Sequence, residues 1–549
     1  MGERFKKAIG IEGKFFDTVW PMIQYCFANI FMGGGGYIIN MYFTVFLTNV
    51  VGMEIRYATF IVMIATIWDG VNDPLMGIIT DRTRSKYGRH RRYLLWSIPP
   101  LVISYIMLWN SFGLNAKERP IFCVVYYAFA YILYKTAYTM VEVPHTAMLP
   151  TLAPEYNKRT QYTSVSYIFN SVGMVPSYVI LLIFLSVFNS SDNLSSDSKA
   201  PFLITGIVLS GVYAAAVFAT FKTCKEPSSL NEKLPPLDLK SAIDEYIQVF
   251  RNKSFRDYFS MTFFWQMARS FYSTTNIYYI TYLVNLYRYY PVFNAFSGVF
   301  ESLAFPLNYA LTMKKGKSKC GAIVTPLMII GLGIAFFVKP VTPDSPYMVS
   351  LVLMILGGAV LYPFGMSGLG FVGNNVLPDI TDVDEVITGR RREGVIGTFN
   401  TMIKQVTGGI MTFSVGLILD SFGLVTGNEG VYIQQTDSAL FGIRLCISVL
   451  PMLSALAAWL LLRRFKMTKD DHTMIRAAIA TKHKYGSVSL SDEQKKRCEL
   501  LTGYKLENTW LGKNNNADEE HTVEKNSDGV YQVLIEQEEE LKQLIAEAD

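Results

Sequence analysis

Long apolar segments recur along the chain and restrict what it can fold into. An α-helix needs about 20 apolar residues to cross the hydrocarbon core of a bilayer, and it satisfies its backbone hydrogen bonds without water. Half of the residues are hydrophobic and 17% are charged, and the charged residues cluster between the apolar segments. The sequence therefore predicts an all-α membrane protein that crosses the bilayer many times.

Twelve apolar segments are expected to be transmembrane helices. They are residues 20–49, 56–80, 93–112, 120–150, 161–188, 201–222, 256–285, 291–313, 319–339, 345–375, 394–420 and 437–464. A charged, proline-containing stretch at 223–255 divides them six and six, as a linker between two bundles would. The expected domains are a bundle at 1–222, a cytoplasmic linker at 223–255, a bundle at 256–465 and a cytoplasmic tail at 466–549.

Lysine and arginine are distributed unevenly between the connections. They crowd residues 81–92, 314–319 and 390–392, all of which follow even-numbered spans. Cytoplasmic loops carry an excess of Lys and Arg, so both termini are expected in the cytoplasm and the protein in the plasma (inner) membrane. In the tail, Ser491 to Gln494 resembles a capping box that opens a short helix ending near Gly503. A solvated tail and a regulatory tail both remain open.

Several other classes are not expected. The net charge of +5 is small for this length, so nucleic acid is not an expected partner. The six cysteines and five histidines are scattered and suggest no metal site. No nucleophile–base pair suggests an enzyme, no cofactor is implied, and oligomerisation is not required.

The second expected span carries two acids inside an apolar run. Asp69 and Asp73 lie four residues apart and so on one helix face. Each charged carboxylate at bilayer depth is unfavourable by roughly 3 kcal/mol, so a bound cation or proton is the natural compensation. Pro74 frees the carbonyl of Gly70 beside Asn72, which completes a set of hard oxygen ligands. The alternative is a structural pair satisfied by a neighbouring Lys or Arg.

The fourth expected span places three polar residues on one face. Lys135, Thr139 and Glu142 fall at i, i+4 and i+7, and Glu142 is a third intramembrane carboxylate. Lys135 is either a partner for these acids or a contact for an anionic substrate.

The second half of the chain contains candidate substrate contacts. Trp265 and Arg269 on the seventh span suit a sugar, because apolar ring faces stack on aromatic rings and hydroxyls need hydrogen-bond partners. Arg269 could also bind a carboxylate, or the pair could serve polar helix–helix contacts. Lys404 lies about 15 Å into its helix from Gly394 and needs an acid or a polar substrate as partner.

Acidic and basic residues occur together near residues 379–393. Asp379, Arg391, Arg392 and Glu393 suit salt bridges that hold a gate and break when it opens. A static surface cluster of charges is the alternative.

The motif Asp69-Gly-Val-Asn-Asp-Pro74, followed by Asp81-Arg82 and Gly88-Arg89, resembles the glycoside–pentoside–hexuronide:cation symporter family. This is the melibiose-permease group of the major facilitator superfamily. Glu142-Val-Pro144 and the region 379–404 are similar to further family signatures, and the resemblance covers roughly residues 17–465. It implies two six-helix bundles around a central cavity that work by alternating access.

The resemblance and the patterns above give the candidate sites. The coupling cation, Na⁺ or H⁺, is expected at Asp69, Asn72, Asp73, Thr139 and Glu142. Substrate is expected at Lys404, Asn400, Arg269, Trp265, Lys135 and Tyr138. Gating is expected at Asp81, Arg82, Arg89, Asp379, Arg391, Arg392 and Glu393.

The chain also departs from the melibiose-permease pattern. The acid that helps to hold a galactoside falls at Gly33, the sugar-contacting arginine falls near Tyr167, and a tryptophan falls at Thr146. Lys135 replaces a small residue. The cation residues are therefore kept and the galactoside contacts are lost, and Lys135 and Arg269 favour a hexuronide or glucuronide.

The expected function is import of a glycoside, pentoside or hexuronide by symport with Na⁺ or H⁺. Lys135 could occupy the electrostatic place of the cation, which leaves proton coupling or facilitated flux open. Two rivals are a transporter of lysolipid-like amphipathic molecules and a non-transporting membrane receptor that signals through the tail.

Overall fold

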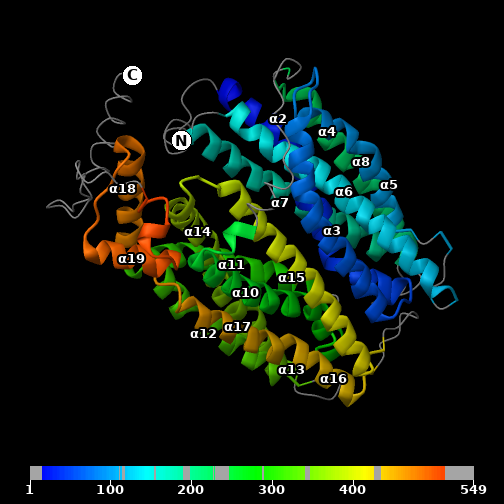
Figure 1. Ribbon diagram of the computed structural model, residues 1–549. Helices are drawn as coiled ribbons and strands as arrows, with labels where there is room; N and C mark the ends of the chain where they lie inside the picture. The colour runs from blue at the N-terminus through cyan, green and yellow to red at the C-terminus, as the bar shows by residue number, and fades with distance from the viewer. Residues whose placement is uncertain are drawn as a thin grey trace. The chain divides into compact units, whose positions relative to one another are not determined.

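The computed structural model (Figure 1) describes most of the chain. The described residues are 15–110, 112–113, 116, 118–153, 156–188, 198–226, 228, 247–286, 290–339, 347–425 and 434–513. Every regular element in these ranges is a helix, which confirms the prediction of an all-α protein. The expected linker falls largely outside them, as does the acidic end of the tail.

The helices form two compact units, and each unit is described by itself. The first comprises Met1–Pro236 and Gly408–Ile443, and the second comprises Leu237–Thr407 and Arg444–Asp549. The first unit contains α2 (Phe15–Val45, continued by the π-helix η1, Phe46–Val50), α3 (Ile55–Arg82), α4 (Arg91–Trp96), α5 (Ile98–Leu108), α6 (Pro120–Leu152), α7 (Tyr156–Phe188) and α8 (Lys199–Thr223). Within it, α2 packs along α7 and α8, and α3 packs along α6.

The second unit contains the later helices. They are α10 (Lys253–Tyr278) with the π-helix η3 (Tyr279–Leu283), α11 (Tyr290–Lys315), α12 (Lys317–Phe336), α13 (Tyr347–Met354), the π-helix η5 (Ile355–Leu361), α14 (Tyr362–Thr388), the π-helix η6 (Leu445–Val449), α17 (Leu450–Leu462), α18 (Lys469–Tyr485), α19 (Asp492–Thr502) and the 3₁₀-helix η7 (Leu506–Asn508). Both α15 (Glu393–Ser421) and α16 (Asp437–Arg444) contribute residues to each unit. Packing of α12 on α14 and of α10 on α17 forms the core of this unit.

Eight helices in the described part of the chain are long and apolar enough to cross a membrane. They are Val19–Val50, Pro120–Leu149, Val165–Leu185, Lys199–Thr223, Lys317–Phe336, Met348–Thr388, Gly394–Ser421 and Asp437–Leu462. The other four expected spans are helical too, at α3, α4 with α5, α10 and α11. Charged side chains lower the hydropathy of α3 and α10, and a break at Ser97 divides α4 from α5.

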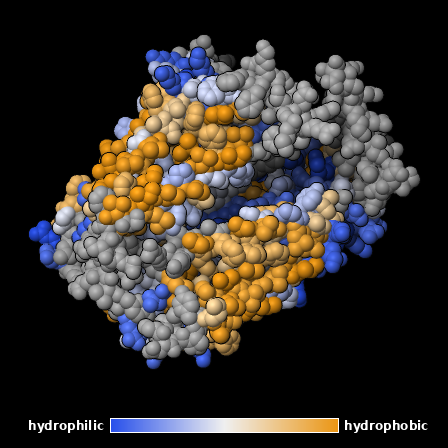
Figure 2. Space-filling model, turned by 180° about the vertical axis from the view of Figure 1, so that it is seen from behind, coloured by the Kyte–Doolittle hydropathy of each residue, from blue (hydrophilic) through white to orange (hydrophobic). Residues whose placement is uncertain are grey.

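Large apolar side chains lie on the surface of these helices. Ile121, Phe122 and Val125 of α6 are 62–75% exposed, and Tyr167 and Ile168 of α7 are 61–70% exposed. Figure 2 shows broad apolar areas on one face of the molecule. Apolar surface on this scale is unfavourable in water and is expected where helices face lipid.

Glycines of α2 allow its backbone to lie directly against α7. A Cβ atom at Gly33 would lie 2.1 Å from the carbonyl oxygen of Asn170, and one at Gly173 would lie 2.1 Å from that of Ile30. Small residues permit such close approach between transmembrane helices. No side chain fits at residue 33 in this packing, so the acid that the melibiose-permease pattern places there has no space here.

The first part of the tail is folded. Ser491 and Gln494 form the predicted capping box, and α19 ends at Gly503 in the left-handed conformation, as predicted. Leu501, Leu511 and Cys498 are buried, and α18 and α19 pack on α14. The interpretation of the tail as a solvated extension is therefore wrong for residues 469–513, because apolar side chains hold it on the second unit.

Candidate functional site

The acids of α3 meet the polar face of α6 inside the first unit. Lys135 Nζ donates to Asp69 Oδ2 at 2.9 Å, and the two side chains are only 15% and 5% exposed. Thr139 Oγ1 donates to Asp73 Oδ1 at 2.9 Å. Both contacts follow from the sequence pattern, because i, i+4 spacing puts each set on one face and α3 packs on α6. An intramembrane ion pair of this kind lowers the unfavourable energy of each buried charge.

The remaining members of the predicted cation site lie nearby. Asn72 is buried, and within the described ranges its Nδ2 has no hydrogen-bond partner. Glu142 is partly buried, and its charge interacts with those of Asp73 and Lys135. Within the described residues, no group of three or more His, Cys, Asp or Glu converges closely enough to hold a metal ion. The site thus places three carboxylates and one lysine near each other without forming a closed carboxylate cage.

Aromatic side chains surround Lys135. Its Nζ lies 6.0 Å from the ring centres of Tyr131 and Tyr138, and the Tyr138 hydroxyl donates to the carbonyl of Met32 at 3.4 Å. Trp68 Nε1 donates to Thr136 Oγ1 at 2.9 Å, which ties α3 to α6 at the residues next to Asp69 and Lys135. These contacts fix the position of the lysine, so its charge stays beside Asp69.

The predicted substrate residues of the second unit meet around one indole ring. Trp265 is 6% exposed, Arg269 Cζ lies 5.9 Å from its ring centre, and Lys404 Nζ lies 5.6 Å from it. Lys404 Nζ donates to Asn374 Oδ1 at 3.3 Å. Among the described residues, no carboxylate forms an ion pair with Arg269 or Lys404, and Trp265 Nε1 has no hydrogen-bond partner. The cluster combines an aromatic face, two cations and an available N–H donor.

Sequence reasoning missed Tyr258 and Asn374, which contact the predicted substrate residues Asn400 and Lys404. Asn400 accepts a 2.7 Å hydrogen bond from Tyr258, a buried contact between α10 and α15. Asn374 holds Lys404 from α14. The signal for Asn374 was an amide pair, Asn374-Asn375, within an otherwise apolar segment, and Tyr258 gave no comparable signal.

The predicted gating residues lie in two places. Arg82 ends α3, and Arg89 lies in the turn before α4. The side chains of Asp81 and Glu393 lie outside the described residues. The loop after α3 is fixed by Glu226, whose carboxylate accepts from the backbone N–H groups of His90 and Arg91 at 2.9 and 3.0 Å. Glu226 belongs to the expected linker and was not anticipated from the sequence.

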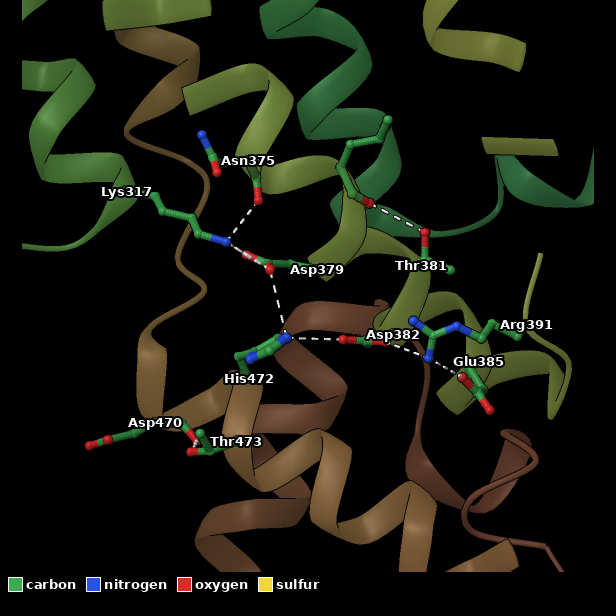
Figure 3. Close-up of polar contacts among 11 residues, drawn as sticks. Lys317, Asn375, Asp379, Thr381, Asp382, Glu385, Arg391, Asp470, His472 and Thr473 are labelled. Atoms are coloured by element: carbon green, nitrogen blue, oxygen red, sulfur yellow. Dashed lines mark hydrogen bonds and ion pairs between the residues drawn. The ribbon is translucent and has the colours of Figure 1, made fainter. Parts of the chain in front are cut away.

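The other gating residues form a charge cluster at the end of α14. Arg392 binds Asp384 through two 2.7 Å hydrogen bonds, and Lys317 binds Asp379 at 2.7 Å. Arg391 lies 3.4 Å from Asp382 and 3.6 Å from Glu385. Figure 3 shows that His472 from the tail also points at Asp379 and Asp382. Sequence reasoning missed Lys317 and His472, since they are distant in the chain and their spacing carries no motif.

Comparison with known proteins supports the resemblance. Residues 25–469 match the family model described as MFS/sugar transport protein. An uncharacterized symporter from Synechocystis is 24% identical over 80% of this chain and 92% of its own. The isoprimeverose transporter of Lactiplantibacillus pentosus is 20% identical, and the match covers 83% of this chain and 90% of the transporter. A putative sulfoquinovose importer of Escherichia coli is 21% identical, and the match covers 82% of this chain and 93% of the importer.

Solved structures give the same fold. A mutant of the nucleoside transporter NupG superimposes with a TM-score of 0.57 at 11% identity, covering 80% of this chain and 99% of that one. A proton-dependent oligopeptide transporter gives a TM-score of 0.55 at 12% identity, covering 82% and 100%. The protein is thus an all-α membrane protein with the major facilitator fold. It belongs to the MFS/sugar transport protein family, the glycoside–pentoside–hexuronide:cation symporters, whose members are transporters and not enzymes.

Proposed function

We propose that the protein imports a sugar or glycoside by symport with Na⁺ or H⁺ through alternating access. It crosses the membrane twelve times, with six-helix bundles at 1–222 and 256–465 and with the linker, the tail and both termini in the cytoplasm. Family membership and relatives named as a symporter, a transporter and an importer support this function.

The observation that carries the proposal is the charge balance between α3 and α6. Three carboxylates, Asp69, Asp73 and Glu142, share the fixed positive charge of Lys135, which pairs directly with Asp69. Asp73 accepts only the neutral Thr139 hydroxyl among the contacts above. A monovalent cation or a proton that enters beside Asp73 and Glu142 therefore removes unfavourable buried charge. Asn72 and Thr139 supply neutral oxygens for a sodium ion.

Loading of this site is coupled to sugar binding by linkage. If the cation raises the affinity for sugar, sugar raises the affinity for the cation by the same factor. The cation draws together α3 and α6, which already share the two side-chain contacts described above. The loaded carrier then changes its accessible side, as transporters with a central site do.

Uptake into proteoliposomes tests the cation site. Labelled glycosides are offered under an imposed Na⁺ or H⁺ gradient to the wild type, to Asp73→Asn and to a matched control, Asp437→Asn, which changes an exposed aspartate at the start of α16. We expect accumulation in the wild type and the control and its loss in Asp73→Asn. A full gradient response in Asp73→Asn would contradict the assignment. Equilibration without accumulation in all three would indicate a uniporter in which Lys135 replaces the coupling cation.

We propose further that the sugar carries an anionic group and that a glucuronide-like hexuronide is the favoured class. Arg269 and Lys404 bring two positive charges to Trp265 without a carboxylate partner in the described part of the chain. Guanidinium and ammonium groups bind a carboxylate or a sulfonate strongly, and the indole presents a face to the sugar ring. Support also comes from the relative named as a putative sulfoquinovose importer, since sulfoquinovose bears a sulfonate.

Competition between substrates tests this preference. We expect a glucuronide to inhibit uptake more strongly than the neutral glycoside of the same aglycone, and Lys404→Gln to remove the difference. Lys319→Gln, an exposed lysine at the start of α12, is the matched control. Equal inhibition by neutral and anionic sugars in the wild type would exclude the anionic preference.

One observation favours a second candidate, transport of a lysolipid-like amphipathic molecule. The first unit contains an open apolar cavity of about 290 Å³, and Phe60, Ile121, Phe413 and Arg56 are among the residues that line it. Competition by lysophospholipid but by no glycoside would support this candidate. Deletion of residues 467–549 tests the receptor alternative, because a transporter should keep uptake after the deletion, whereas a non-transporting receptor should lose its output.

A further inference from the structure

The strap, defined here as residues 466–513, lies almost wholly beyond the family match, which ends at residue 469. Ile475, Ala478 and Leu511 of the strap are fully buried. Its two helices are joined to each other because Arg497 Nε donates to Asp471 Oδ1 at 2.8 Å. Burial and an internal ion pair are the properties of a folded module and not of a solvated extension.

The strap connects the end of α14 to the start of α10. Trp510 N and Leu511 N donate to the carbonyls of Ile387 and Val386 at 3.1 and 3.2 Å. These carbonyls have no partner within α14, because they belong to its last turn. At the other side, Ser254 Oγ donates to the carbonyl of Leu501 at 2.7 Å. The strap thus caps one helix and holds a second.

Two histidines of the strap, His472 (Figure 3) and His483, complete the charge cluster of α14. His472 Nε2 lies 3.0 Å from Asp382 and 3.7 Å from Asp379. His483 Nε2 lies 3.1 Å from Glu385, and its ring packs on Trp510 with 4.7 Å between ring centres.

The charges around these histidines show why they matter. The buried carboxylates of the cluster are Asp379, Asp382, Asp384 and Glu385, and Lys317, Arg391 and Arg392 are among the permanently charged side chains paired with them. Arg391 faces two of the three carboxylates that the histidines contact, Asp382 and Glu385. A protonated imidazole adds positive charge directly beside these buried acids. An imidazole gains its charge between about pH 5 and pH 8.

The end of α14 that the strap contacts, residues 379–388, follows a proline. Pro378 cannot donate to the carbonyl of Asn374, so the helix has a hinge between the apolar segment and the charge cluster. Lys317 Nζ donates to the next carbonyl, that of Asn375, at 2.7 Å. The side chain of Asn374 holds Lys404 of the candidate substrate site. Asn374 lies at the hinge itself, because its carbonyl is the one that Pro378 leaves without a helical donor, so bending at the hinge changes the helix where the Lys404 contact is held.

We propose that the strap is a proton-responsive clamp that positions the end of α14 and, through the Pro378 hinge, the Asn374–Lys404 pair. His472 and His483 are positioning residues: when protonated they tighten the clamp, and when neutral they loosen it. The effect on sugar binding rests on the proposed function, whereas the clamp itself does not.

Hydrogen exchange of the full chain in detergent tests the clamp without substrate or gradient. Exchange of peptides covering 379–388 and 505–513 is compared at pH 6 and pH 8, with times scaled for the intrinsic effect of pH. We expect roughly fivefold stronger protection at pH 6 in the wild type, a modest factor because both histidines are partly exposed. In the double variant His472→Gln/His483→Gln, protection from exchange is expected to be low at both pH 6 and pH 8.

Two further variants separate the role of charge from damage to the fold. His472→Lys keeps a positive charge at pH 8 and is expected to retain protection there. Lys495→Gln, which alters an exposed pair on α19, is expected to behave as wild type. Protection that is independent of pH in the wild type, or lost equally in His472→Lys and His472→Gln, would overturn the proposal.

Sugar binding by the purified carrier provides the second readout. We expect the dissociation constant to rise about threefold from pH 6 to pH 8 in the wild type and to be independent of pH in His472→Gln/His483→Gln. The double histidine variant keeps the whole cation site, so a pH dependence of binding that persists in it would belong to that site and not to the clamp. If no glycoside binds at all, the proposed function fails while the exchange result stands. A pH-dependent clamp with no change in binding would overturn the link to Lys404.

Discussion

At the scale of single residues, the pair of Lys135 and Asp69 is the contact whose loss has the clearest consequence. Both side chains are buried, so Lys135→Gln leaves a carboxylate without its cation. We expect a loss of about 3 kcal/mol in the free energy of unfolding. Asp69→Asn/Lys135→Gln is expected to recover most of it, because neither charge remains. Thermal unfolding in detergent measures the stability of the single and the double variant. Additive losses of stability in the double variant would show that the two charges do not interact.

Glu226 provides a residue-scale prediction of pH dependence. Burial alone would raise its pKa, but the His90 side chain and the N–H groups of Arg91 and His90 hydrogen-bond the carboxylate, and its pKa is lowered. A lowered pKa contributes stability that is complete above the unfolded value of about 4.3 and is lost as the pH falls through the folded value. We therefore expect Glu226→Gln to lower the melting temperature at pH 7 and to weaken its fall on acidification.

The control for that experiment is Glu507→Gln, an exposed glutamate in η7. Its melting temperature should follow the wild type at every pH. Identical acid profiles for Glu226→Gln and the wild type would mean that the hydrogen bonds to Glu226 do not contribute to stability.

At the scale of elements, the contact between α2 and α7 depends on glycine at particular positions. Gly33→Ala places a Cβ atom against the backbone of Asn170, so the helices must separate, and we expect a loss of about 2 kcal/mol. Gly36→Ala is the matched control, because its Cβ would meet its nearest neighbour, Tyr138, at 3.9 Å. The control should be neutral or slightly stabilising. Equal melting temperatures for the two variants would contradict the close packing.

Features that depend on residues close together in the sequence could be predicted, whereas contacts between distant segments could not. Apolar length predicted the helices, and the Ser491–Gln494 pattern predicted both ends of α19, because these features act within one or two turns. The contacts of His472, Glu226 and Tyr258 were not predictable, since each joins segments at least 90 residues apart without a spacing pattern. The contacts of Lys135 and Thr139 lie between these cases: the shared face was evident, but which acid each would meet depends on how α3 packs on α6.

At the scale of the whole molecule, the proposed topology makes a labelling prediction. All six native cysteines are buried, so they give little background with a membrane-impermeant maleimide. Lys319→Cys and Asp437→Cys introduce exposed thiols at the starts of α12 and α16. With twelve spans and cytoplasmic termini, Asp437→Cys should react in intact cells and Lys319→Cys only after permeabilisation. Reaction of both from the same side would exclude this topology.

The charge cluster at the end of α14 also has a consequence for biosynthesis. During synthesis of the chain, Arg392, the partner of Asp384, follows it after only eight residues, whereas His472, a partner of Asp382, follows after 90 residues. At about 5–20 residues per second, that interval lasts on the order of 5–20 s, during which the last helices must be inserted. The cluster therefore assembles in two stages. A chain that stops after its final apolar segment would leave the ribosome with acids exposed that the completed chain buries, a difference that quality-control proteases can recognise.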